Sequence, residues 1–381
     1  MFLIILIVYD NSKRWKERSY MIQPGLKGVV ATETKISHID GEKGRLIYRG
    51  YEVKELTEHD SFEEVAYLLW FGVLPTTKEL TKFNEELKSH RTLSSYLKTI
   101  LDSLPREMDM MSVLRTVVSA EGGLHYTSKP TIQQCMKLTS MMPTLIAYRN
   151  HSLQGTPFVE PRQDLGHVEN YLYMLNGVLP TKAQTNALET YMILTMEHGM
   201  NASTFSARVT ASTESDLISA VTSAIGTMKG PLHGGAPSEV ILLLEEIGCT
   251  ENTEKVLRQK LENREKLMGF GHRVYKTHDP RAIALKSTLL KQVGEDEWLD
   301  LALHVENTAV ELLEEYKPGR SLYTNVEFYA AAIMKAIQMD PSLFTPTFTA
   351  SRIVGWTAHI LEQSQNNTIY RPESKYTGRI L

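Results

Sequence analysis

The chain has 381 residues and a formal charge of −4, with 41 basic and 45 acidic side chains. Hydrophobic residues make up 42% and charged residues 23%, which excludes a disordered or fibrous chain, and the length predicts two or more domains. No long basic run could follow a phosphate backbone, so we expect no nucleic-acid partner. The two cysteines, Cys135 and Cys249, lie far apart, which argues against a disulfide framework or a thiolate metal site and fits a reducing cytoplasm.

The run from Met1 to Tyr9 is wholly apolar. A membrane span needs about 20 such residues, and neither a basic start nor a small-residue cleavage site marks a signal peptide. We therefore expect no membrane segment. Residues 1–20 are expected to be a poorly ordered extension or foreign to the natural protein, which would then start at Met21, because globular patterning begins only afterwards.

Residues Ile36 to Tyr51 predict two short strands around a turn that contains glycine. Helical signals dominate from there on. Ser61 and Glu64 form a capping box ahead of apolar residues at helical spacing, and Gly72 ends that helix.

Later helices follow the same pattern. One is predicted from near Ser212 to the pair Gly230-Pro231, and the next runs from Pro237 to Gly248. A third has one apolar face and ends at Pro318-Gly319. No Gly-rich loop follows a predicted strand, as a dinucleotide-binding fold requires. The sequence therefore predicts an all-α protein with a minor N-terminal β-hairpin, whose chemistry lies between helices in an interdomain cleft.

Three histidines lie beside glycine where predicted helices begin or end: His198, His233 and His272. His233 precedes a helix N-terminus, where free N–H groups and the dipole disfavour a second proton, so we expect a neutral imidazole that can donate a hydrogen bond to a developing enolate. No HExxH or other close ligand pair is present, so we expect no catalytic metal.

Arginines form a second group: Arg281, Arg352 and Arg371. Most arginines lie on the surface, but Arg352 follows Phe348 in a largely apolar stretch, where an unpaired guanidinium would be costly. A dicarboxylate ligand held by bidentate guanidinium groups would explain several buried arginines together.

These segments, in this order, resemble the citrate synthase family. The matching stretches are ISHIDG at 36–41, EHGMNASTF at 197–205, GPLHGGA at 230–236, GFGHRVYK at 269–276 with DPR at 279–281, NVEFY at 325–329, Ser351-Arg352 and Arg371-Pro372. The resemblance covers the chain from about Gly28 to the C-terminus. It implies a large helical domain at residues 21–234 and 336–381, a small helical domain at 235–335, and a site between them.

The resemblance also implies roles. His233 would stabilise the enol of acetyl-CoA, and His272 would donate to the oxaloacetate carbonyl. Oxaloacetate would be held by His198, His272, Arg281, Arg352 and, from the other subunit of a homodimer, Arg371. CoA would be bound by Leu267, Met268, Gly269, Phe270, Gly271 and Lys276. No metal or redox cofactor is implied.

One position departs from the family. Its catalytic base is normally the aspartate of Asn-Val-Asp, whereas this chain has Glu327 there, with an arm one methylene longer. We expect a citrate synthase that condenses acetyl-CoA with oxaloacetate and hydrolyses citryl-CoA. The alternatives are a 2-methylcitrate synthase that uses propionyl-CoA, and a weakly active copy that senses CoA or a dicarboxylate. A metal-dependent hydrolase, which a chelator would inactivate, is disfavoured.

Overall fold

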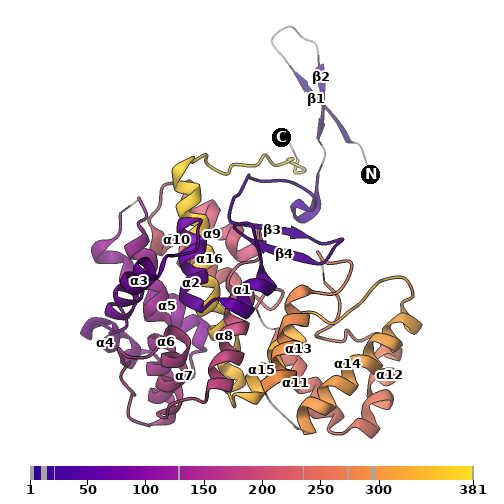
Figure 1. The fold of residues 1–381 in the computed structure, drawn as a ribbon. Helices are drawn as coiled ribbons and strands as arrows, with labels where there is room; N and C mark the ends of the chain where they lie inside the picture. The colour runs from indigo at the N-terminus through magenta and orange to yellow at the C-terminus, as the bar shows by residue number, and fades with distance from the viewer. Residues whose placement is uncertain are drawn as a thin grey trace.

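The structure is a computed structural model that describes residues 4–9, 15–20, 22–127, 129–234, 236–272, 274–292 and 297–379. It is mostly helical, as predicted, with two small antiparallel sheets near the N-terminus. Figure 1 shows a larger group of helices beside a smaller one, which is formed by the segment from α11 to α15. The predicted domain boundary at residue 235 lies outside the described residues, and both boundaries stay predictions.

The N-terminal segment forms a hairpin of β1 (Ile4–Tyr9) and β2 (Trp15–Tyr20), in which Ile4 pairs with Tyr20 and Tyr9 with Trp15. The expectation that residues 1–20 are a poorly ordered extension or foreign to the natural protein stays a prediction. In Figure 1 the hairpin projects away from the helices, near the C-terminal tail.

The predicted hairpin after residue 36 is confirmed. Strands β3 (Ser37–Asp40), β4 (Arg45–Tyr48) and β5 (Tyr51–Glu52) form one antiparallel sheet. Its turn contacts the loop ahead of α13, where Lys276 N donates to Gly41 O at 2.9 Å. A Cβ on Gly41 would lie 2.4 Å from the carbonyl oxygen of Val274, so this close approach requires glycine.

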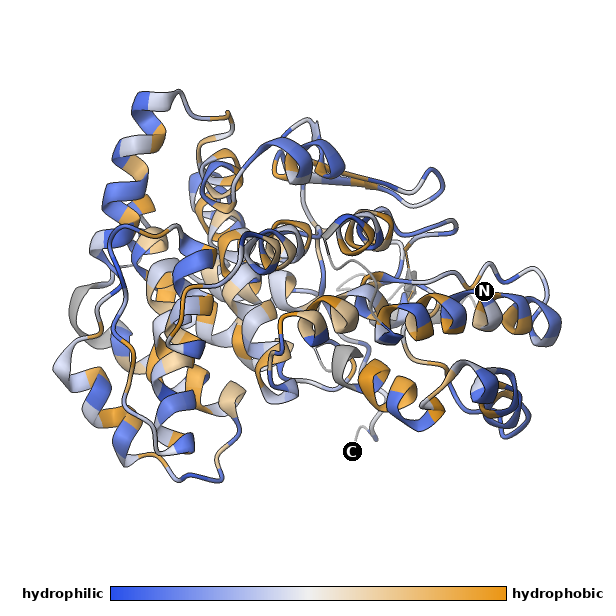
Figure 2. Cartoon of the chain, turned by 60° about the horizontal axis from the view of Figure 1, so that its bottom comes forward, coloured by the Kyte–Doolittle hydropathy of each residue, from blue (hydrophilic) through white to orange (hydrophobic). Residues whose placement is uncertain are grey.

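The larger group of helices comprises α1 (Val53–His59), α2 (Phe62–Phe71), α3 (Thr77–Ser89), α4 (Ser95–Ser103), α5 (Met110–His125), α6 (Ile132–Gln154), α7 (His167–Asn176), α8 (Lys182–Met196), α9 (Ala202–Ser212), α10 (Leu217–Met228) and α16 (Phe344–Gln365). Helix α16 is buried on nearly every side, which identifies it as the central helix of this group. Figure 2 shows hydrophilic residues mainly on the outward faces of the other helices.

The predicted helix signals have mixed outcomes. Ser61 and Glu64 make the capping box of α2, and Gly72 ends that helix in the left-handed conformation, as predicted. The predicted start near Ser212 is wrong, because Ser212 ends α9. Helix α10 is instead capped by Asp216, whose carboxylate accepts a hydrogen bond from the N–H of the third residue inside the helix.

The smaller group comprises α11 (Ala236–Ile247), α12 (Thr253–Glu262), α13 (Pro280–Gln292), α14 (Glu297–Tyr316) and α15 (Val326–Ala336). Helix α15 packs against α11 and α13 of its own group and against α8 of the larger one, so it lies where the two groups meet. Within the described residues, no helix combines the length and apolarity needed to cross a bilayer.

Candidate active site

Two of the predicted histidines meet around one tyrosine. The rings of His198 and His272 are 5.5 Å apart, centre to centre, and that of Tyr275 is 4.7 Å from His272. His198 Nε2 lies 3.1 Å from the Tyr275 hydroxyl oxygen. Burial lowers the pKa of His198 well below its ordinary value, and the nearby arginines lower it further, so this ring is neutral.

The proton position of His272 follows from its neighbours. Its Nδ1 accepts hydrogen bonds from the backbone N–H groups of Val274 (3.0 Å) and Tyr275 (3.1 Å), so the neutral ring carries its hydrogen on Nε2. Burial lowers the pKa of His272 to about 4, with Arg281 adding to the shift. Nε2 lies 3.3 Å from Arg281 Nη2, and because both groups are donors, an acceptor oxygen placed between them would be bound by both.

The Arg281 guanidinium is held by the buried carboxylate of Asp279. Its Nε and Nη2 donate to the two oxygens of Asp279 at 3.0 and 2.8 Å, and both side chains are almost completely buried. Asp279 also accepts a hydrogen bond from the N–H of Val326 at 3.1 Å. One carboxylate therefore fixes both the start of α13 and the first turn of α15.

Arg352 enters from the central helix α16. It is 2% exposed, its Nε donates to the carbonyl of Thr195 at 2.6 Å, and its guanidinium lies 4.8 Å from the ring centre of Phe348. Burial lowers the pKa of this arginine. No other hydrogen-bond partner for its guanidinium is found among the described residues, which leaves the Nη groups available to an anion.

Glu327 lies in the first turn of α15, where its N–H donates to the capping oxygen of Asn325 at 3.0 Å. Burial raises the pKa of its carboxyl to about 7, although Arg281 and Arg352 pull in the opposite direction. A carboxyl with this pKa can be ionised near neutral pH and still be a strong enough base to take a proton from carbon.

His233 lies in the turn between α10 and α11, and its Nε2 is 2.8 Å from Ser203 Oγ. That hydroxyl also accepts from Trp356 Nε1 at 3.0 Å and lies 2.8 Å from Asn201 Oδ1. Burial lowers the pKa of His233 to about 4, followed by the effect of Arg352. The neutral state agrees with the sequence-based expectation, but burial and a nearby cation are its causes, whereas we had expected the helix N-terminus to be.

The single proton of Ser203 decides which His233 nitrogen can donate. If Ser203 donates to Asn201, then His233 Nε2 must carry the ring hydrogen. If Ser203 turns its hydroxyl hydrogen to His233, the ring hydrogen moves to Nδ1, which is free to donate to a ligand. Ser203 lies in the stretch at 197–205 that matches the family, but the sequence does not predict it as a site residue.

The loop from Leu267 to Gly271 is fastened to the start of α15. Asn325 N donates to Gly269 O and Asn325 Nδ2 to Gly271 O, both at 2.9 Å. Gly269 and Gly271 have φ of 88° and 79°, which side chains rarely adopt, and a Cβ on Gly269 would lie 2.9 Å from Phe328. The loop therefore keeps a fixed position relative to Glu327, which follows Asn325 by two residues.

Arg371 lines a cavity that none of the three predicted histidines lines. It follows α16 in the C-terminal tail, and this cavity of about 1300 Å³ is also lined by Arg208 and Glu362. Among the described residues, no group of three or more His, Cys, Asp and Glu side chains is arranged to hold a metal ion.

A mostly helical protein with neutral histidines, buried arginines and one carboxyl of raised pKa around a single site has the parts of an acyl-transfer enzyme that works by acid–base chemistry. The family model described as "Citrate synthase, C-terminal domain" matches residues 25–373. The chain belongs to the citrate synthase family.

Individual relatives agree with this assignment. The chain is 42% identical to citrate synthase 2 of Bacillus subtilis, over 93% of this chain and 95% of the relative. It is 40% identical to 2-methylcitrate synthase of Mycobacterium tuberculosis, over 94% and 91%. Among solved structures, citrate synthase of Thermotoga maritima superposes with a TM-score of 0.85 at 39% identity, covering 94% of this chain and 97% of that one.

A structure from Thermoplasma acidophilum is a ternary complex of citrate synthase with carboxymethyl coenzyme A and oxaloacetate. It superposes with a TM-score of 0.85 at 29% identity and covers 95% of this chain and 97% of that one.

Proposed function

We propose that the chain condenses acetyl-CoA with oxaloacetate and hydrolyses the resulting citryl-CoA to citrate and CoA. The observation that carries this proposal is the joint geometry of His272, Arg281 and Glu327. Two donors, His272 Nε2–H and Arg281 Nη2–H, lie 3.3 Å apart and can bind neighbouring oxygens of one ligand, and the Glu327 carboxyl, with a pKa of about 7, interacts with the same arginine. A reaction in which a deprotonated carbon attacks a ketone flanked by carboxylates would use each of these groups.

Oxaloacetate is held by its two carboxylates and its ketone. Arg352 and Arg281 grip the carboxylates, and the Nε2–H of His272 donates to the ketone oxygen. His198 lies against the same ligand. Arg371 completes the grip from the other subunit of a homodimer, a proposal supported by its place in a cavity that none of the three histidines lines.

The acyl-CoA binds along the loop from Leu267 to Gly271, with Lys276 near its phosphates. The Glu327 carboxylate removes a proton from the acyl methyl group. Ser203 turns its hydroxyl hydrogen from Asn201 to His233 Nε2, so that the ring hydrogen lies on Nδ1, and this Nδ1–H donates to the thioester oxygen, where charge develops. The enol carbon then attacks the ketone carbon, and His272 Nε2–H donates to the alkoxide oxygen that forms. Water finally cleaves the thioester and releases CoA as a thiol.

A second acyl donor is also supported. Two relatives at 40% identity are named 2-methylcitrate synthase, so propionyl-CoA is the alternative substrate. The two donors differ by one methylene, which changes selectivity by only about 1–3 kcal/mol.

The test is release of free thiol by the purified protein with oxaloacetate and either acetyl-CoA or propionyl-CoA, beside the variants Glu327→Gln and Glu327→Asp. We expect turnover that disappears with Gln and survives with Asp, and the faster donor identifies the product. A folded protein that binds oxaloacetate but releases no thiol from either donor would refute the proposal and favour a sensor.

A further inference from the structure

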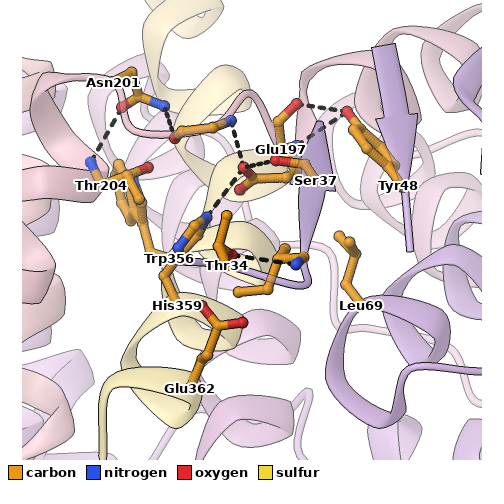
Figure 3. A network of polar contacts seen from close by, with 12 residues as sticks. Thr34, Ser37, Tyr48, Leu69, Glu197, Asn201, Thr204, Trp356, His359 and Glu362 are labelled. Carbon is orange, nitrogen blue, oxygen red and sulfur yellow. Dashed lines mark hydrogen bonds and ion pairs between the residues drawn. The ribbon is translucent and has the colours of Figure 1, made fainter. Parts of the chain in front are cut away.

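A buried acid beside the site has a role that the steps above do not use. Glu197 directly follows α8 and precedes His198 in sequence, and it is 0% exposed. Its Oε1 accepts hydrogen bonds from Ser37 Oγ at 2.9 Å and from His359 Nε2 at 3.1 Å, and its backbone carbonyl accepts from Tyr48 Oη at 2.6 Å. Figure 3 shows Glu197 between these three side chains, which come from β3, β4 and α16.

The direction of the His359 hydrogen bond is fixed by an arginine on its other side. Arg208 Nε, which can only donate, lies 2.9 Å from His359 Nδ1. Nδ1 is therefore the acceptor, the ring hydrogen lies on Nε2, and Nε2–H donates to Glu197. Arg208 in turn is held by Glu362 and Gln363, so the tautomer of the buried His359 ring is fixed by a chain of paired groups.

Helix α16 holds the end of α8 at three successive contacts along one face. Arg352 donates to the carbonyl of Thr195. Three residues on, a Cβ on Gly355 would lie 2.4 Å from the carbonyl oxygen of Met196 and 2.5 Å from Glu197 Oε2, so the segment packs directly on the helix backbone. One turn further along α16, His359 Nε2–H donates to Glu197 Oε1. The spacing i, i+3, i+7 places all three contacts on one side of the helix.

The charge on Glu197 has a counterpart in the site. Burial raises the pKa of Glu197, but His359, Arg352 and Ser37 outweigh it and the pKa is lowered, so the group is an anion. Arg352 is buried, and Glu197 favours its charged form. A buried guanidinium with no opposite charge nearby would be unstable. The Glu197 carboxylate balances the charge of Arg352 without a hydrogen bond to it, so the Nη groups of Arg352 are not occupied by this carboxylate.

We propose that Glu197, held by His359, is a positioning residue for oxaloacetate: it sets the place of His198 next to it in sequence and balances the charge of Arg352. This inference rests on the proposed function. Neither Glu197 nor His359 touches the reacting atoms, so losing their contact affects oxaloacetate much more than the acyl-CoA.

The experiment compares His359→Leu with His359→Gln. Leucine removes the donor to Glu197, whereas a glutamine amide can accept from Arg208 and donate to Glu197, as the ring does. We expect His359→Leu to raise KM for oxaloacetate by about tenfold or more and KM for the acyl-CoA by less than about threefold, and His359→Gln to restore oxaloacetate KM to within about threefold of the parent value.

Two further variants keep the result interpretable. Ser37→Ala removes a second, neutral donor to the same oxygen from a strand near the surface, and should raise oxaloacetate KM by about threefold even if His359→Leu does not fold. Glu63→Gln is the control, because Glu63 is also a buried carboxyl and accepts a hydrogen bond from the N–H of His167. It should leave both KM values unchanged.

An unchanged oxaloacetate KM in folded His359→Leu or in Ser37→Ala would overturn the inference. So would a failure of His359→Gln to improve on His359→Leu, or equal changes in both KM values, since a merely structural role would produce them. If the parent protein releases no thiol, the proposed function fails, and calorimetric titration of oxaloacetate into the same variants still tests the positioning role separately.

Discussion

Replacing Glu327 by glutamine is expected to stabilise the folded protein at alkaline pH while abolishing turnover. Burial raises the pKa of this carboxyl from 4.5 to about 7, a difference of roughly 2.5 pH units, so keeping it ionised in the folded state costs about 3 kcal/mol. Glutamine removes the charge but must itself be desolvated, and the side chain keeps some contact with solvent. The net gain is therefore about 1–2 kcal/mol.

The sign of the pH dependence follows from the raised pKa. Below about pH 4.5 the carboxyl is neutral in both states and stability is unaffected; the loss grows between about pH 4.5 and 7 and is constant above. Urea denaturation of the parent and of Glu327→Gln at pH 5 and pH 8 measures it. We expect the change on substitution to be more favourable at pH 8 than at pH 5 by about 2 kcal/mol, because the penalty for ionising the folded-state carboxyl is mostly absent at pH 5. Equal gains at both pH values would refute the argument from charge.

Thiol release should fall about tenfold per unit below about pH 7, because Glu327 must be ionised to accept a proton; a flat kcat/KM profile for the acyl-CoA between pH 5 and 9 would contradict this. Ser203→Ala should lower kcat by about tenfold with an unchanged oxaloacetate KM in steady-state assays, because Ser203 no longer sets which nitrogen of His233 carries the ring hydrogen. An unchanged kcat would show that Ser203 has no role in the site. Gly355→Ala should lower the free energy of unfolding by about 1–3 kcal/mol, because the new Cβ would overlap a backbone carbonyl. Gly226→Ala is the control and should not lower it, because the nearest side-chain atom lies 3.7 Å from the new Cβ. Equal urea midpoints for the two variants would contradict the packing.

Helices were predictable where the signals are local. The capping box of Ser61 and Glu64 and the glycine at position 72 act within a few residues, so they can be read directly from the sequence. The start of α10 was misplaced because Ser212 and Asp216 are both residue types that favour the N-cap, whereas only Asp216 caps α10 and Ser212 is the last residue of α9. The packing of the preceding helix decides between them, and that packing is not local.

The site was predictable only as far as its motifs reach. The stretches around His198 and His272 name the residues. The N–H groups that fix the proton of His272 lie in its own stretch, but the hydroxyl that His198 contacts lies 77 positions away. Glu197 and His359 are 162 positions apart, and no periodic pattern links them. Ser203 and Tyr275 are ordinary polar residues until the fold brings a histidine against each one.

The three contacts between α16 and the end of α8 have a consequence for how the gene can vary. Loops on the outside, such as residues 155–166 between α6 and α7, can gain or lose residues without moving any site group. A single residue inserted between Thr195 and His198 would move the main-chain carbonyls and the Glu197 carboxylate away from the groups of α16 that contact them. Chain length is therefore expected to be fixed across this junction, even where the identity of the side chains drifts.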